Sequence, residues 1–73
     1  MMKKEEFIEE IKEILLIENK VDENTGIEVD SMASLLLIAF YDENFGKTIT
    51  QEEIKKFKKI SDCIHFAGIE NFD

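Results

Sequence analysis

The sequence predicts an all-α fold, a small bundle of three longer helices and one short helix in a single domain, residues 1–73. Apolar residues recur at helical spacing in several separate segments. The chain has no proline, which favours helices over a turn-rich sandwich. Its 73 residues, 44% of them hydrophobic, are enough for one core but only for a marginally stable domain.

The first helix is expected from about Lys4 to Ile17. Its apolar positions lie three and four residues apart, which places them on one face with charged residues opposite. The expected inward residues are Phe7, Ile8, Ile11, Ile14 and Leu15. Residues 18–29 are polar and rich in turn-forming types, so they predict a loop in which Val21 and Ile27 anchor against the core.

A second helix is expected to open at Asp30-Ser31, because both residues are common helix caps and an apolar run follows them. Gly46 is well placed to end it, since glycine readily takes the left-handed conformation found after helices. Ser34, one turn into the helix, is expected to pack inward and to bond to a backbone carbonyl. The side chains expected to share the core face are Leu35, Leu37, Ile38, Tyr41 and Phe45.

A short third helix is predicted after the link of residues 47–50. Thr50 and Glu53 have the spacing of a capping box, in which each side chain accepts a hydrogen bond from the other residue's backbone N–H. Ile54 and Phe57 are expected to form the buried side of this helix.

A last helix is expected to start at Lys59 or Ser61 and to run to about Ala67, where Gly68 ends it. Its expected inward residues are Ile60, Cys63 and Ile64. Three apolar residues near the carboxyl end either fold back on the bundle or belong to a frayed tail. These are Phe66, Ile69 and Phe72.

The net charge is −8, from 17 acidic residues against nine lysines. An acidic surface repels the phosphates of nucleic acids, so we expect no nucleic-acid partner. It favours encounter with basic patches on partner proteins. Five lysines gather around the predicted third helix and are interpreted as a solvated face. They are Lys47, Lys55, Lys56, Lys58 and Lys59.

Cys63 is the only cysteine, so no internal disulfide is possible, and we expect no metal site. The first residues are charged, unlike a secretion signal. The most apolar stretch, Met32 to Tyr41, is shorter than the about 20 residues that span a bilayer, so no membrane partner is expected. These observations favour a cytoplasmic protein, which we expect to be a monomer.

Ser31 is the residue expected to carry chemistry. At the junction of loop and helix its hydroxyl would be accessible to a modifying enzyme, and Asp30 beside it offers a carboxylate for recognition. A phosphate attached there would lie near the free amide groups and the positive dipole end of the helix. The local sequence alone leaves open the alternative that Ser31 is only a helix cap.

The wider pattern resembles that of acyl and peptidyl carrier proteins. Asp30-Ser31-Met32 is similar to the Asp-Ser-Leu/Met signature of this family. Residues 35–46 resemble its second helix, residues 49–53 the loop into its third helix, and residues 60–64 the start of its fourth. The resemblance covers nearly the whole chain and is firmest from Asp30 onward.

The resemblance implies a carrier and not an enzyme, with no catalytic residues. A phosphopantetheinyl transferase would attach 4'-phosphopantetheine from coenzyme A to Ser31, within the signature formed with Asp30 and Met32. The thiol of this arm would hold an acyl group as a thioester and present it to acyl-loading and acyl-transferring enzymes, as in fatty acid biosynthesis. The core residues that would line a space for the cargo are Leu37, Ile38, Tyr41, Ile60 and Ile64.

The sequence departs from the family pattern at several positions. Glu28 stands where glycine is common, and the loop before the serine is short. Ala33 and Leu36 stand where the front of the second helix usually carries acid, which remains only at Asp42 and Glu43. These departures favour a dedicated carrier of a specialised pathway, such as one that makes a surface polysaccharide or a secondary metabolite.

An apolar docking surface is expected on the second helix. Ala33, Leu36 and Phe40 follow one another at three- and four-residue spacings, which predicts an exposed stripe for partner enzymes. Asp42 and Glu43 would aid the encounter with these partners. The alternative is that the helix is rotated so that Leu36 belongs to the core.

Two other function classes remain open. Residues 42–53 place acid or amide at positions one and three of an EF-hand-like loop and glutamate at position twelve, but Lys47 stands where the turn requires glycine. A calcium-binding module is therefore one alternative, and a helical adaptor that only binds other proteins is the second. Cys63 and His65 would not share a helix face, so they do not suggest a catalytic or metal pair.

Overall fold

The computed structural model describes residues 2–68 and residue 72. Within them the chain forms four helices, α1 (Lys4–Leu15), α2 (Ser31–Phe45), α3 (Gln51–Lys55) and α4 (Ile60–Ala67). The described part of the chain contains two isolated β-bridges and no longer strand. The predicted all-α bundle, with one short helix third in order, is confirmed.

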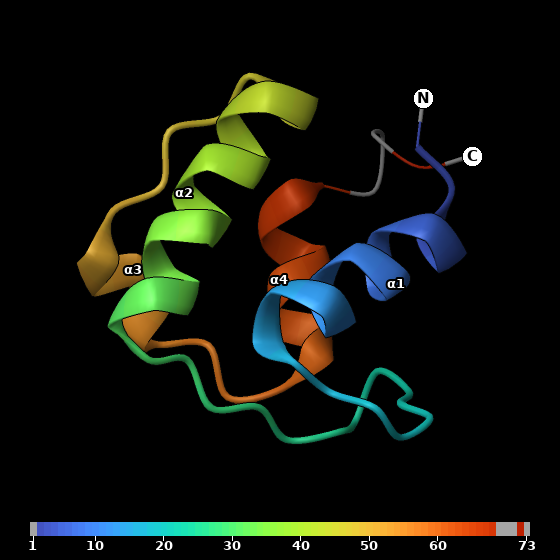
Figure 1. The fold of residues 1–73 in the computed structure, drawn as a ribbon. Helices are drawn as coiled ribbons and strands as arrows, with labels where there is room; N and C mark the ends of the chain where they lie inside the picture. The colour runs from blue at the N-terminus through green and yellow to red at the C-terminus, as the bar shows by residue number, and fades with distance from the viewer. Residues whose placement is uncertain (1, 69–71, 73) are drawn as a thin grey trace.

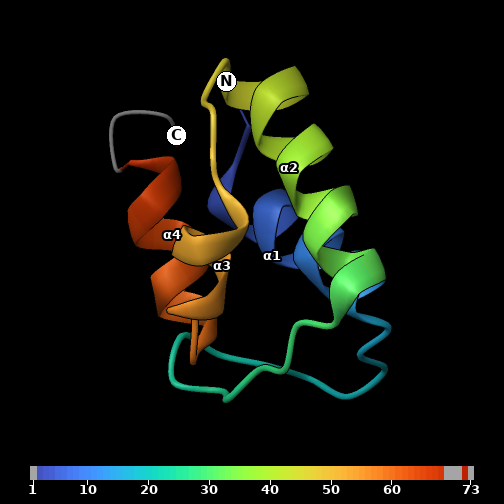
Figure 2. The same ribbon diagram turned by 90° about the vertical axis from the view of Figure 1, so that its left-hand side faces the viewer.

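The helices surround one core. α1 packs against α2 and α4, and α2 also contacts α3. In Figure 1 the long connection between α1 and α2 runs along the bottom of the bundle and brings the beginning of α2 to that end of the molecule. Figure 2 shows the short α3 on the side of the bundle between α2 and α4. In the described part of the chain, none of these helices has both the length and the apolar character needed to cross a membrane.

Aromatic side chains from several elements fill the core. Phe7 of α1 and Tyr41 of α2 are fully buried, with ring centroids 6.1 Å apart. The Tyr41 hydroxyl donates a 2.7 Å hydrogen bond to the Cys63 carbonyl, so its polar tip is satisfied inside the core. Phe72 packs on Phe7 with centroids 5.2 Å apart, so this part of the tail folds back, whereas Ile69 lies outside the described residues.

The rotation of α2 differs from the one expected. Leu35 was expected to face the core, but its side chain is 61% exposed. Ala33 and Phe40 were expected on the surface, but both are buried, and the Phe40 ring lies 5.5 Å from that of Phe7. These expectations were wrong because residues 31–41 carry no charge, so hydropathy selects no face of the helix. The packing of Phe40 against Phe7 of α1 selects the buried face instead.

The first helix ends at Leu15 and not at the expected Ile17. Leu16 takes a left-handed conformation with φ 57°, which is uncommon outside glycine, and stops the helix. The N–H of Ile17 then donates a 2.9 Å bond to the Lys12 carbonyl, which satisfies the helix end. By contrast, Gly46 ends α2 at φ 62°, as predicted.

The third and fourth helices begin where expected. The Thr50 hydroxyl accepts from the Glu53 N–H at 3.2 Å, and the Glu53 carboxylate accepts from the Thr50 N–H at 3.1 Å, which confirms the capping box. α4 begins directly after Lys59. The Asp62 carboxylate accepts from the N–H groups of Lys58 and Lys59, and these bonds hold the pKa of Asp62 below its usual value.

The connection between α1 and α2 is fastened to the rest of the fold. The Ile27 N–H donates to the Lys58 carbonyl at 2.9 Å, and the Ile60 N–H donates to the Thr25 carbonyl at 3.0 Å. Val21 and Ile27 are partly buried against the core, so their expected role as anchors is confirmed. The bonds tie the connection to the link between α3 and α4 and to the first residue of α4.

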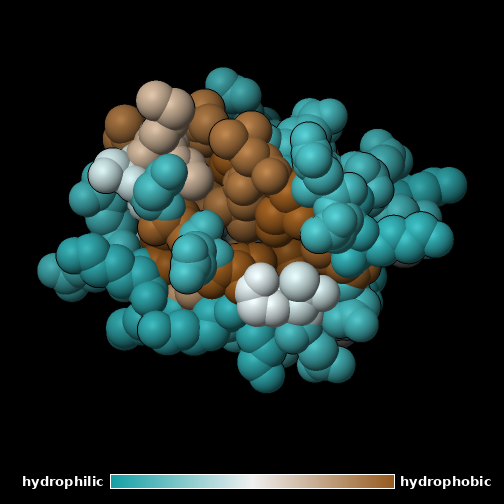
Figure 3. All heavy atoms as spheres, turned by 60° about the horizontal axis from the view of Figure 1, so that its bottom comes forward, coloured by the Kyte–Doolittle hydropathy of each residue, from teal (hydrophilic) through white to brown (hydrophobic). Residues whose placement is uncertain are grey.

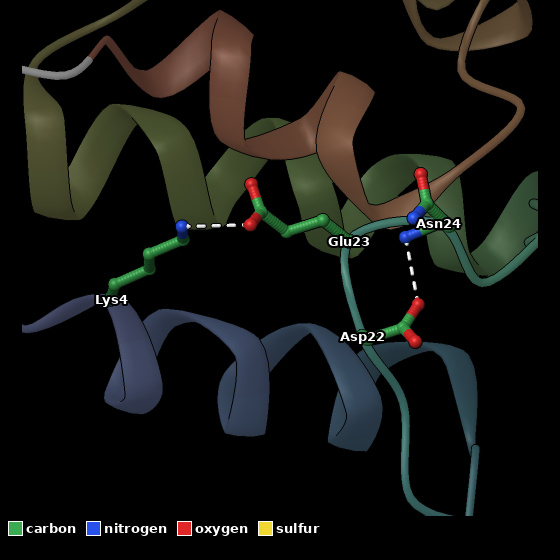
Figure 4. A network of polar contacts seen from close by, with 4 residues as sticks. All are labelled: Lys4, Asp22, Glu23 and Asn24. Atoms are coloured by element: carbon green, nitrogen blue, oxygen red, sulfur yellow. Dashed lines mark hydrogen bonds and ion pairs between the residues drawn. The ribbon is translucent and has the colours of Figure 1, made fainter.

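An ion pair also joins the connection to α1, next to a hydrogen bond within the connection itself (Figure 4). The Lys4 ammonium of α1 lies 3.1 Å from the Glu23 carboxylate. One residue earlier in the connection, the Asp22 carboxylate accepts a 2.8 Å bond from the Asn24 N–H and so stabilises a local turn. Both residues of the ion pair are solvent-exposed, so the pair orients the connection more than it stabilises the fold.

The concentration of acid in the first 30 residues predicts a salt-dependent stability. From Glu5 to Asp30 there are ten carboxylates and only two lysines, Lys12 and Lys20. Added salt shortens the distance over which these carboxylates repel one another, because the Debye length falls from about 30 Å at 0.01 M to about 3 Å at 1 M. The melting temperature should therefore rise along a sodium chloride series measured by circular dichroism.

The matched control for this series is a Glu6→Gln, Glu10→Gln double variant, because both residues are exposed and form no ion pair with a described residue. It should melt higher than wild type at low salt and respond less to added salt. A wild-type melting temperature that is flat or falls across the series contradicts the prediction. A rise specific to micromolar calcium would instead support the EF-hand alternative.

Candidate functional site

The structure places Ser31 at the first position of α2, with its side chain exposed. Asp30 is the N-cap, and its carboxylate accepts a 2.8 Å hydrogen bond from the Ala33 N–H. The alternative that Ser31 is only the helix cap is therefore wrong, because Asp30 provides the cap. Among the described residues, the Ser31 hydroxyl has no hydrogen-bond partner, so it is free for chemistry.

Ser34 is the nearest second hydroxyl and has a different environment. Its hydroxyl donates a 3.0 Å hydrogen bond to the Asp30 carbonyl, one turn back, and its side chain is partly buried. This confirms the expected bond to a backbone carbonyl. Of the two serines at the beginning of α2, only Ser31 offers an exposed and uncommitted oxygen.

Ser31 opens into a hollow of about 350 Å³ between the beginning of α2 and α3. Its lining brings together residues that are far apart in the sequence. The two contributed by α3 are Gln51 and Lys55, and the α2 side adds Ser34. Sequence reasoning missed this juxtaposition, because only the packing of α3 beside α2 produces it. The complete lining is Val29, Asp30, Ser31, Ser34, Gln51 and Lys55.

A second, smaller hollow of about 150 Å³ lies between the end of α1 and the beginning of α2. Its walls are mainly apolar, and Leu16, Met32 and Leu36 line it. Three carboxylates stand at the same hollow, those of Glu13, Glu28 and Asp30. The three apolar side chains are also among the most exposed large ones of the molecule. Figure 3, which brings the connection to the front, shows apolar surface surrounded by hydrophilic side chains on this face.

We call the exposed side chains of Leu16, Met32 and Leu36, which line this hollow, the apolar patch. Leu36 is 48% exposed, so the alternative that it belongs to the core is wrong. The expected stripe of Ala33, Leu36 and Phe40 is corrected, because only Leu36 is exposed. Sequence reasoning missed Leu16, which is 87% exposed because its left-handed backbone turns the chain out of α1.

Asp42 and Glu43 lie in the last turn of α2 and are exposed. The negative end of the helix dipole disfavours acid there, so their placement does not serve the stability of the helix. They lie six and seven residues beyond Leu36, about two helical turns along α2. Neither Asp42 nor Glu43 lines the hollow between the end of α1 and the beginning of α2.

The twelve residues proposed as a calcium loop do not form a loop. Asp42 and Asn44, its first and third positions, are inside α2, and the Asn44 amide donates a 3.0 Å bond to the Phe40 carbonyl. Glu53, the twelfth position, uses its carboxylate in the capping box of α3. In the described ranges, 2–68 and 72, no three His, Cys, Asp or Glu residues are grouped so that they could hold a metal ion.

Cys63 and His65 are on different faces of α4, as predicted: Cys63 is fully buried and His65 is exposed. Burial raises the pKa of the Cys63 thiol to about 12, because the interior disfavours the thiolate. Burial likewise raises the pKa of Tyr41 far above its ordinary value. Cys63 is therefore a core residue and not a nucleophile.

The burial of the Cys63 thiol predicts that it reacts slowly with alkylating reagents. At pH 8 a thiol with a pKa of about 12 is ionised in about one molecule in 10,000, so Cys63 of the folded, unmodified chain should resist iodoacetamide. Intact-mass measurement after alkylation should show no adduct on the folded chain and one adduct after unfolding in urea. Rapid alkylation of the folded chain, at the rate seen in urea, would contradict the buried position of this thiol.

Comparison with known proteins agrees with the resemblance carried by these residues. The chain is similar to an acyl carrier protein of Petrotoga mobilis, with 29% identity over 76 residues. The similarity covers 92% of this chain and 89% of that protein. No protein-family model matches the chain, and no solved structure matches it.

Proposed function

We propose that this chain is an acyl carrier protein that receives a 4'-phosphopantetheine arm on Ser31 and carries acyl groups as thioesters. The observation that carries the proposal is the exposed Ser31 hydroxyl at the first position of α2, which has no hydrogen-bond partner among residues 2–68 and 72 and lies beside the cap that Asp30 provides. Similarity to the Petrotoga mobilis carrier along nearly the whole chain supports it.

The proposed modification is a substitution at phosphorus. The Ser31 oxygen forms the new bond to the pantetheine-bearing phosphorus of coenzyme A, adenosine 3',5'-bisphosphate leaves, and the hydroxyl proton passes to a base of the transferase. Ser31 and Met32 are the first two residues of α2, so no earlier helical turn offers a carbonyl to their N–H groups. These N–H groups and the positive end of the helix dipole favour a phosphate at this position. When attached, the arm supplies a thiol that holds the acyl group.

The chain's own part in this function is presentation, so it needs no catalytic residue. The acyl-loading and acyl-transferring enzymes would supply the chemistry. The core side chains proposed to shelter the cargo belong to α2 and α4, and all but the partly buried Ile38 are buried. They are Leu37, Ile38, Tyr41, Ile60 and Ile64.

We place the docking surface for partner enzymes on the apolar patch, with Leu36 at its centre. Exposed apolar groups grouped beside a functional residue commonly mark an interaction site. The carboxylates of Glu13, Glu28 and Asp30 around the hollow fit a partner that offers an apolar side chain flanked by basic groups. Asp42 and Glu43 would act mainly on the rate of encounter.

An apolar rather than acidic front of α2 also suits a carrier dedicated to a specialised pathway. The first eleven residues of α2 carry no charge, and the apolar patch takes Met32 and Leu36 from them. A contact of this kind selects a partner by shape as well as by charge. We therefore include a dedicated set of partner enzymes in the proposed function.

Intact-mass measurement tests the proposal. The purified chain is incubated with coenzyme A, magnesium and a transferase of broad specificity. A carrier gains the mass of one phosphopantetheinyl group, and fragmentation places it on Ser31. A calcium-binding module or a helical adaptor gains nothing, and an unchanged mass with an active transferase rejects the proposed function.

A further inference from the structure

The hollow between α2 and α3 brings one cation close to the proposed attachment point. Of its six lining residues, only Lys55 is positively charged and only Asp30 is negatively charged. Asp30 already directs its carboxylate at the Ala33 N–H. Lys55 is exposed in the last turn of α3 and forms no ion pair with any residue that the structure describes.

The neighbouring lysines have other surroundings. Lys56, the next residue, lines a different hollow with Glu53 and Asp62. Lys47 lies over the Phe66 ring, 5.7 Å from its centroid. Within the described lysine group around α3, Lys55 is therefore the one that shares a hollow with Ser31.

We propose that this hollow seats the phosphodiester at the base of the arm, with the Lys55 ammonium as its counterion and the Gln51 amide as a neutral donor. The inference rests on the proposed function, and it assigns a binding role to residues of α3. A phosphodiester carries one negative charge, which this acidic chain would otherwise repel. An ammonium group at its edge offsets that repulsion and holds the base of the arm toward α3.

A thermodynamic cycle of four proteins measures the proposed contact between the Lys55 ammonium and the phosphodiester. Wild type and Lys55→Gln are each prepared without and with the arm, in reductant and at low salt, and their melting temperatures are compared. The change in melting temperature on attaching the arm should be about 1 to 8 °C more negative in Lys55→Gln than in wild type, the range expected for one exposed ion pair in a small domain. The matched control is Lys56→Gln, which should behave as wild type.

The phosphorus resonance of the modified protein gives a second readout, independent of any partner enzyme. Its chemical shift should change in Lys55→Gln, stay unchanged in Lys56→Gln, and return toward the wild-type value in Lys55→Arg. Equal arm-dependent melting shifts and equal phosphorus resonances in the two glutamine variants would overturn the inference while leaving the carrier function intact. A chain that takes no arm at all would overturn both.

Discussion

Replacing Ser31 with alanine is expected to abolish attachment of the arm while leaving the helical fold in place. The substitution removes the only oxygen at this position that can form the bond to phosphorus. Asp30 caps α2 without help from Ser31, so the variant should lose no more than about 0.5 kcal/mol of unfolding free energy. Intact-mass measurement after transferase treatment, together with thermal melting, checks both parts.

The matched control is Ser34→Ala, three residues away. Its hydroxyl is committed to the Asp30 carbonyl, so this variant should gain the arm as wild type does. An equal mass gain in Ser31→Ala and wild type would reject the assignment to Ser31 and point to Ser34. An unfolded Ser31→Ala would instead show that Ser31 has a structural role that its hydrogen bonds do not reveal.

Replacing Leu36 with glutamate is expected to weaken delivery of the loaded arm to a cognate enzyme by about tenfold or more, the effect of losing a central apolar contact. The side chain is 48% exposed, so the unfolding free energy should change by only about 0.5 kcal/mol. The kcat/KM of the partner enzyme for the loaded carrier measures delivery, and thermal melting measures stability. Leu36→Gln should show the same loss of delivery without the added charge.

The next residue along α2 gives the contrasting variant. Leu37 is fully buried, so Leu37→Glu places an unpaired charge in the core. The cost of several kcal/mol is comparable to the whole stability of a domain this small, and the variant should be unfolded. A Leu36→Glu protein that is folded and still served normally by its partner would reject the docking surface. An unfolded Leu36→Glu would show that this residue, too, supports the core.

The sequence predicted those features that depend on a few neighbouring residues. Gly46 ends α2 because it takes a left-handed φ of 62° without a side-chain clash. Thr50 and Glu53 begin α3 because their spacing lets each bond to the other's backbone. The polar pair Asp30-Ser31 before an apolar run predicted the beginning of α2 in the same way, whereas Ser31 was chosen as the candidate site on the resemblance of the wider pattern to carrier proteins.

The end of α1 shows where local signals were not enough. Leu16 continues the apolar pattern of the helix, and nothing in its residue type predicts a left-handed backbone. The chain must turn there to reach the contacts of the following connection with α4 and with Lys58. The turn exposes Leu16 and adds it to the apolar patch.

By itself the sequence determined that the chain is a helical bundle, where its helices begin, and which serine is the candidate site. Only the tertiary structure decided which face of α2 is exposed and which residues surround Ser31. An uncharged apolar helix has no preferred buried face of its own, so contact with Phe7 of α1 turned Phe40 inward and Leu36 outward. Likewise, Lys55 is 24 residues from Ser31 in the chain, and only the packing of α3 beside α2 brings both to one hollow.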